Sequence, residues 1–196
     1  MVIAATKTMS EEAYREFALG DPQGQWELVG GQLREIPWMS AGHNDVAVDL
    51  TAQLLPQLDR GQYVVRLGQA RLRVSSETYY IPDVAVIPTA MVRPLRRNPR
   101  GLDAYGEPLP LVVEVWSPST GGYDVRAKIP DYQRRGDPEI WFIHPFARTL
   151  TVWRRQPDEK YAETVYRAGK VQLPSLPGVE IDLDALTAWQ DEAVSN

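Results

Sequence analysis

Residues 109–116 read LPLVVEVW, an apolar run in which Glu114 is the only charge. A run of this length and composition is typical of a strand buried on both faces of a sheet. A second run, YYIPDVAVI over residues 79–87, contains Asp83 as its only charge. Acidic side chains are rarely buried unless they are paired or bind a cation, because an isolated ion loses its hydration. The two runs therefore predict a central sheet that carries two carboxylates in need of partners.

The N-terminal third of the chain predicts a helix, a hairpin and a second helix. Thr8 to Leu19 has capping-box spacing at its start, with Thr8 as the expected N-cap. Residues 25–29 and 32–36 flank the pair Gly30-Gly31, which suits a tight hairpin turn. Apolar residues recur every four positions within residues 40–59, which indicates an amphipathic helix packed on a sheet.

The rest of the chain adds short strands, one arginine-rich loop and a short helix. Residues 93–110 contain four arginines and several prolines, and this composition predicts a long surface loop. A helix is expected from Pro130 to near Gly136, since proline is tolerated in a first turn. Further strands are expected at residues 63–67, 70–74, 139–144, 149–154, 161–166, around 171 and 179–183, before a closing helical turn at 184–189. Together these elements predict one α/β domain spanning residues 1–196, with its core at about 8–189 and a mixed central sheet flanked by helices.

Composition limits the chemistry that this chain can perform. The absence of cysteine excludes disulfides, thiolate zinc sites and cysteine nucleophiles. The two histidines, His43 and His144, lie far apart in the sequence, so any metal must be held mainly by oxygen ligands, as Mg²⁺ or Mn²⁺ is. No apolar run is long enough for a signal peptide or a membrane helix, and we expect a cytoplasmic protein with no membrane partner and no organic cofactor.

Charge is unevenly distributed along the chain. The net charge is −5, yet residues 61–135 carry eleven basic and seven acidic side chains. This middle section is suited to face a polyanion, while the acidic flanks oppose general nucleic-acid binding.

Two more charged residues belong with the acids of the predicted sheet. Glu27 lies between Trp26 and Leu28, and Lys128 is the only lysine between Lys7 and Lys160 in a chain with many arginines. A shared metal site and separate structural ion pairs both account for the buried acids, and Lys128 on composition alone is an ordinary surface lysine.

The ordered set of motifs resembles the PD-(D/E)XK nuclease superfamily, and within it the Uma-type family of restriction-endonuclease-like proteins. The matching stretches are WELVGGQL (26–33), His43, IPDVAV (81–86), LVVEVWSPST (111–120), Asp124, Lys128, Pro130, Tyr132, Gly136 and EIW (139–141). They extend over residues 8 to about 189, and their order is more specific than any one of them.

This resemblance implies a restriction-endonuclease-like fold and a metal-dependent phosphodiesterase site. Asp83, Glu114 and Val115 would hold the metal, Glu27 would be a further acidic ligand or water holder, and Lys128 would be the catalytic lysine. One departure is important: Trp116 occupies the position two after Glu114, where the superfamily has its lysine. Lys128 can replace that lysine only if the following helix returns its amine to the site.

Other cations are candidate contacts to substrate phosphates. Arg73, Arg96, Arg97 and Arg126 lie in or near the basic middle section. His43, near the start of a predicted helix, is suited to remain neutral and act as a donor or ligand, although a structural histidine explains it equally.

The sequence thus predicts a Mg²⁺- or Mn²⁺-dependent endonuclease acting on DNA, and a homodimer, because two-fold symmetry suits cleavage of both strands. The alternative is a nucleic-acid-binding or regulatory protein with the nuclease fold and little or no cleavage. A glycoside hydrolase with two carboxylates is a third reading, but it leaves Lys128 and the arginine loop without a role.

Overall fold

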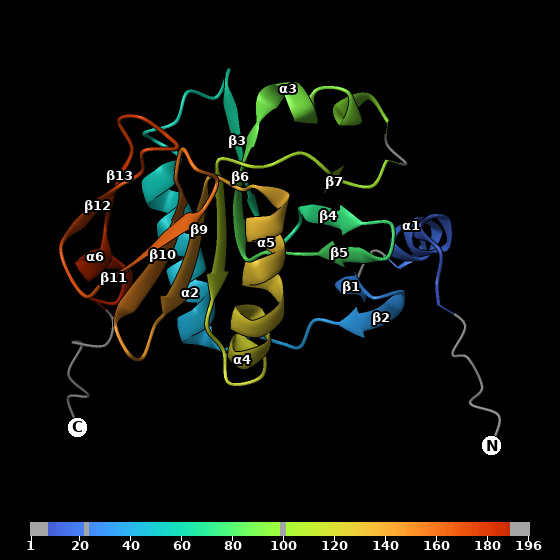
Figure 1. Ribbon diagram of the computed structural model, residues 1–196, viewed down its shortest axis with the longest axis horizontal. Helices are drawn as coiled ribbons and strands as arrows, with labels where there is room; N and C mark the ends of the chain where they lie inside the picture. Colours follow the sequence, from blue (N-terminus) through green and yellow to red (C-terminus); the bar gives the residue numbers. More distant parts are fainter. Residues whose placement is uncertain (1–7, 22–23, 99–100, 189–196) are drawn as a thin grey trace.

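The computed structural model describes residues 8–21, 24–98 and 101–188, and within them the strands form two larger sheets and one small one (Figure 1). The largest sheet has the strand order β11-β10-β9-β8-β6-β3. Its strands are β3 (Tyr63–Leu67), β6 (Val84–Pro88), β8 (Leu111–Val115), β9 (Glu139–His144), β10 (Thr149–Arg155) and β11 (Tyr161–Tyr166). β8 and β9 run parallel, whereas the other neighbours are antiparallel. The mixed central sheet predicted from the sequence is therefore confirmed.

Helices cover both faces of this sheet at β8, which explains its apolar sequence. All five residues of β8 are buried, with α2 (Ala41–Leu54) on one face and α5 (Ile129–Arg135) on the other (Figure 1). Val113 belongs to the same apolar cluster as Leu50 of α2, and Val112 to the same cluster as Tyr132 of α5. Because side chains of a strand alternate between its faces, Glu114 lies on the α5 face with Val112.

A second, five-stranded sheet carries the predicted hairpin. Its order is β2-β1-β5-β4-β7, with β1 (Trp26–Val29), β2 (Gln32–Glu35), β4 (Arg71–Ser75), β5 (Thr78–Tyr80) and β7 (Ala104–Tyr105). The turn between β1 and β2 needs positive φ at Gly30 (55°) and Gly31 (75°), which only glycine adopts readily. The hairpin is confirmed, and its two-residue turn places Glu27 directly opposite Arg34.

The run at residues 79–87 is divided between the two sheets, although the sequence predicts one strand there. β5 ends at Tyr80 and β6 begins at Val84. Pro82 has no N–H to donate to a sheet, and the N–H of Ile81 donates to the Glu27 side chain (2.9 Å). Asp83 therefore occupies a short connection between sheets rather than the middle of a strand.

The helical segment before Gly136 is longer than predicted. It begins with α4 (Gly121–Tyr123), continues through the π-helical turn η2 (Asp124–Lys128) and ends with α5 at Gly136, whose φ is 84°. Pro130 lies inside this segment instead of starting it. Proline removes one helical hydrogen bond and clashes with the preceding turn, and the widened π-helical turn directly before it accommodates this change.

The remaining elements differ from the predictions mainly at their ends. α1 (Glu11–Gly20) is capped by Ser10 instead of Thr8. α2 ends earlier than predicted: Leu55 still has helical φ and ψ, but Pro56 has no N–H to donate to the preceding turn. The predicted arginine-rich loop follows α3 (Thr89–Val92) and contains the 3₁₀ turn η1 (Leu95–Arg97) and β7. β12 (Lys170–Gln172) pairs with β13 (Glu180–Asp182), and α6 (Leu183–Leu186) follows them.

Predictions for residues 1–7, Arg100 and 189–196 lie outside the described residues. Over the ranges that are described, none of the helices has the length and apolar character needed to span a bilayer.

Candidate functional site

The pairing of β6 with β8 brings Asp83 and Glu114 together. Val84 pairs with Val113 in antiparallel register, so continuing the register by one step sets Asp83 opposite Glu114. Residues directly opposite in such a pair have neighbouring side chains. Both acids line one cavity, and Asp83 accepts a hydrogen bond from the N–H of Val115 (2.7 Å). The two carboxylates predicted from separate apolar runs therefore meet at one place.

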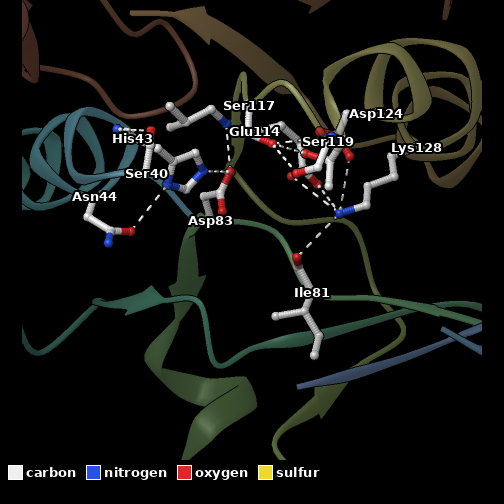
Figure 2. A network of polar contacts seen from close by, with 12 residues as sticks. Ser40, His43, Asn44, Ile81, Asp83, Glu114, Ser117, Ser119, Asp124 and Lys128 are labelled. Atoms are coloured by element: carbon white, nitrogen blue, oxygen red, sulfur yellow. Dashed lines mark hydrogen bonds and ion pairs between the residues drawn. The ribbon is translucent and has the colours of Figure 1, made fainter. Parts of the chain in front are cut away.

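Lys128 extends from η2 into the centre of this acidic cavity. Figure 2 shows its ammonium directed toward Glu114, Asp124 and the carbonyl of Ile81. Its Nζ lies 2.8 Å from Glu27, 3.2 Å from Glu114 and 3.5 Å from Asp124. The amine thus returns to the glutamate of β8 even though Trp116 replaces the lysine of the superfamily motif.

Two buried contacts hold the acids around Lys128 in position. One oxygen of Glu27 accepts hydrogen bonds from the N–H of Ile81 and from Lys128, which ties the hairpin to the connection before β6. The hydroxyl of Tyr132 in α5 donates to Glu114 (2.6 Å). Each carboxylate is therefore fixed by a second element, and the cavity is formed by both sheets and the helical segment.

Burial and mutual repulsion set the electrostatics of the cavity. Burial raises the pKa of Glu114 well above its usual range, Lys128 opposes this rise, and the charges of Asp124 and Asp83 increase it. Burial likewise raises the pKa of Asp124. Burial by itself lowers the pKa of Lys128, but the surrounding carboxylates, Glu114 and Glu27 first, raise it well above its usual value. The site therefore holds a protonated lysine beside Glu114 and Asp124, whose ionisation burial opposes.

His43 contacts the same site from the opposite side of Asp83. Its Nε2 lies 3.1 Å from a carboxylate oxygen of Asp83, and Ser40 caps the helix that carries it (Figure 2). Burial lowers the pKa of His43, but the hydrogen bond with Asp83 and its charge outweigh that effect and raise it. His43 and Asp83 also line a larger groove beside the acidic cavity. Asp83 is thus reachable from both spaces.

The cavity offers carboxylate oxygens, which are the donors that Mg²⁺ prefers, but its free space is too small for an ion with its full shell of waters. Among the described residues, no three His, Asp or Glu side chains are arranged to surround a metal ion. The ammonium of Lys128 lies where Glu27, Glu114 and Asp124 converge, and this explains the absence. One oxygen of Asp124 is buried without a hydrogen-bond partner, and Mg²⁺ needs only one or two carboxylates because it keeps several waters. The space within the cavity is about 10 Å³, roughly that of one water molecule.

The structure does not bring the four candidate arginines to this cavity. Arg73 donates from two nitrogens to Glu11 and is engaged in that ion pair. Arg96 and Arg97 are exposed in η1, beyond the far end of β6 from Asp83. Arg126 is exposed on η2 and donates to the carbonyl of Gly122.

The cavity includes an arginine and a tyrosine that the sequence analysis does not name as site residues. Arg34 and Tyr123 line it, and the guanidinium of Arg34 stacks over the Tyr123 ring, 3.4 Å from its centroid. The sequence does carry a signal for Arg34, since a two-residue turn at Gly30-Gly31 sets it opposite Glu27. No sequence signal marks Tyr123, whose place depends on how the helical segment packs.

Comparison with known proteins now places the chain in a family. Residues 11–186 match the model of the family Uma2, which is described as "Putative restriction endonuclease". This chain belongs to the Uma2 family. The match covers the hairpin, both acid-bearing segments and Lys128, so the resemblance seen in the ordered motifs is confirmed.

Relatives of this Uma2 chain include one protein sequence and one solved structure. An uncharacterized protein from Synechocystis is 30% identical over 140 residues, which cover 68% of this chain and 72% of that protein. A crystal structure from Anabaena variabilis, of a protein described as a putative nuclease belonging to DUF820, superposes with a TM-score of 0.72. That similarity covers 92% of this chain and 98% of the other at 16% identity, and it confirms the fold predicted from the sequence.

Proposed function

We propose that this Uma2 protein hydrolyses phosphodiester bonds of DNA with the help of Mg²⁺ or Mn²⁺. The observation that carries the proposal is the meeting of Asp83, Glu114 and Lys128 in one cavity, from the connection before β6, from β8 and from η2. Membership of a family described as putative restriction endonucleases supports the reaction class. A divalent cation would supply positive charge beside the phosphoryl group and acidify a water.

In this proposal each charged residue of the cavity has a separate role. Asp83 and Glu114, with Val115 next to them, hold the cation. Lys128 stays charged among its carboxylates and offsets charge that develops on the phosphoryl oxygens. Glu27 keeps Lys128 in place through its 2.8 Å contact. The apolar walls of β6 and β8 exclude bulk water and so strengthen each of these interactions.

Contacts outside the cavity complete the proposal. The exposed arginines Arg96, Arg97 and Arg126 would bind phosphates away from the cleaved bond. Two copies of the chain would cut the two strands of a duplex, and light scattering of the purified protein would give the mass of a dimer. A cytoplasmic location suits such an enzyme and is part of the same proposal.

A plasmid-nicking assay tests the proposed reaction. Wild-type protein with supercoiled plasmid and Mg²⁺ or Mn²⁺ should produce open circles, and EDTA should stop the reaction. Glu114→Gln and Asp83→Asn should each slow nicking by about a hundredfold or more, because each removes a charged group that acts in the transition state. Nicking that survives both substitutions would contradict the assignment of these residues.

A matched control uses another buried carboxylate. Glu139 in β9 is as buried as Glu114 but is held by Arg154 and does not line the cavity. Glu139→Gln should lower thermal stability yet keep nicking activity at temperatures where the variant is folded. Equal losses in both variants would indicate that folding, not chemistry, explains the effect.

One observation favours a second candidate function, binding of nucleic acid without efficient cleavage. The ammonium of Lys128 already compensates three carboxylates, which leaves a smaller negative charge to attract a cation. A protein of this kind would bind plasmid DNA but would not nick it, whichever divalent metal ion is added.

A further inference from the structure

Polar atoms without partners gather around the acidic cavity. Five buried side-chain atoms among the described residues lack a hydrogen-bond partner. Three of them, Arg34 Nη1, Tyr123 OH and Asp124 Oδ1, belong to residues that line this one cavity, and of these only Asp124 Oδ1 has an ion-pair partner, the ammonium of Lys128 at 3.5 Å. Burying a polar group without a partner is costly and uncommon in native proteins, so such atoms find their partners in water or in a ligand that enters the cavity.

The charge of Arg34 is not neutralised by an ion pair with the carboxylates beside it. The hairpin register sets Arg34 opposite Glu27, the natural partner for a cross-strand ion pair. Glu27 is instead engaged by Lys128 at 2.8 Å and by the N–H of Ile81 at 2.9 Å. Over the described ranges, no carboxylate lies within ion-pair distance of Arg34. A cavity rich in acids thus contains one arginine whose charge is available.

Tyr123 holds this arginine in a defined plane. The guanidinium carbon lies 3.4 Å from the centroid of the Tyr123 ring, a stacked cation–π contact. Tyr123 is in α4, immediately before the π-helical turn that carries Asp124 and Lys128. The stack therefore joins the hairpin to the helical segment at the wall of the cavity, and it presents a planar donor without the freedom of an exposed side chain.

We propose that Arg34 Nη1 and the hydroxyl of Tyr123 form an anion site that binds a non-bridging oxygen of the substrate phosphodiester. Both atoms are donors, and a planar guanidinium with a neighbouring hydroxyl suits the oxygens of a phosphate. The third unpartnered atom, Asp124 Oδ1, is an acceptor and takes no part in anion binding. This inference rests on the proposed nuclease function for the identity of the phosphate, while the anion site itself depends only on Arg34 and Tyr123.

The first experiment measures binding of inorganic phosphate to metal-free protein in EDTA, by calorimetric titration at constant ionic strength. Arg34→Met should weaken phosphate binding about tenfold or more, since it removes a charged donor. Tyr123→Phe keeps the ring and should weaken binding by a smaller factor. Arg34→Lys keeps the charge but loses the planar fork, and should fall between wild type and Arg34→Met. Arg60→Met, which removes an exposed arginine outside the cavity, should bind phosphate like wild type.

Two results would overturn the anion site: no phosphate binding by the wild type, or equal affinity in the wild type and Arg34→Met. Circular dichroism checks that each variant is folded, and Tyr123→Phe with Arg34→Lys decides the matter if Arg34→Met does not fold.

The second experiment separates this inference from the proposed function. Nicking of plasmid by Arg34→Met should show a raised KM, because binding of substrate is weakened. Normal kinetics in this variant would defeat the anion site and leave the nuclease proposal intact. Arg34-dependent phosphate binding in a wild-type protein that nicks no DNA would defeat the nuclease proposal and leave the anion site intact.

Discussion

Replacing Lys128 by methionine should destabilise the protein strongly, because it leaves three buried carboxylates without their compensating positive charge. The ammonium lies 2.8, 3.2 and 3.5 Å from Glu27, Glu114 and Asp124. At an effective dielectric constant of about 20, each unit-charge attraction at these distances is about 5–6 kcal/mol. The cost of taking these charges out of water offsets most of that gain, and removal of one partner from a buried pair typically costs about 3–5 kcal/mol. We therefore expect Lys128→Met to lower the free energy of unfolding by about 3–5 kcal/mol at pH 8.

Urea unfolding followed by tryptophan fluorescence measures this loss, and the melting temperature should fall by about 6–20 °C for a chain of this size. The loss should be smaller at pH 5 than at pH 8. Burial raises the pKa of Glu114, and without the ammonium that pKa rises further. A folded carboxyl with a raised pKa binds its proton at low pH, so its penalty develops only as pH rises.

An exposed lysine provides the control for this substitution. Lys160 pairs with Asp158, and the two side chains are 83% and 58% exposed. Lys160→Met should change the unfolding free energy by about 0.5 kcal/mol or less. A loss below about 1 kcal/mol for Lys128→Met at pH 8, or the same loss at both pH values, would refute the reasoning.

Two further predictions concern residues outside the cavity. The hydrogen bond from Arg73 lowers the pKa of Glu11 to about 2, so the stabilisation by Glu11 is present above its ordinary pKa and disappears as pH falls toward 2. Glu11→Gln should thus cost about 1 kcal/mol at pH 7, a value kept small because solvent screens the part-exposed Arg73, and only a minor part of that at pH 2. Equal melting temperatures of variant and wild type at pH 7 would contradict this. Gly121→Ala would bring a Cβ to within 2.2 Å of Trp116 and should cost about 1–3 kcal/mol in urea unfolding. Gly20→Ala meets nothing within 4 Å and should not destabilise, and an equal cost at both glycines would argue against the close packing.

Much of the local structure follows from the sequence because its signals are short in range. The apolar run at 111–115 forms a fully buried strand, and the glycine pair at 30–31 sets the hairpin and its register. A lone acid in each apolar run marked Asp83 and Glu114 as residues that need a partner. These inferences use only the spacing of neighbouring residues and the cost of burying a charge.

The same signals fail where long-range packing decides between alternatives. One apolar run at 79–87 is divided between two sheets, because the Glu27 side chain takes the N–H of Ile81. A proline that suits a helix start lies within a longer helical segment, and the π-helical turn before it directs Lys128 into the cavity.

The sequence by itself determined which residues could not be buried alone, since hydration cost depends on the side chain and its neighbours along the chain. Only the tertiary structure decided which charged groups pair with one another. Lys128 forms an ion pair with Glu27, and Arg34 stacks on the ring of Tyr123 instead. Charge pairing depends steeply on distance and solvent exclusion, and both arise only when the hairpin, two strands of the central sheet and the helical segment pack around one cavity.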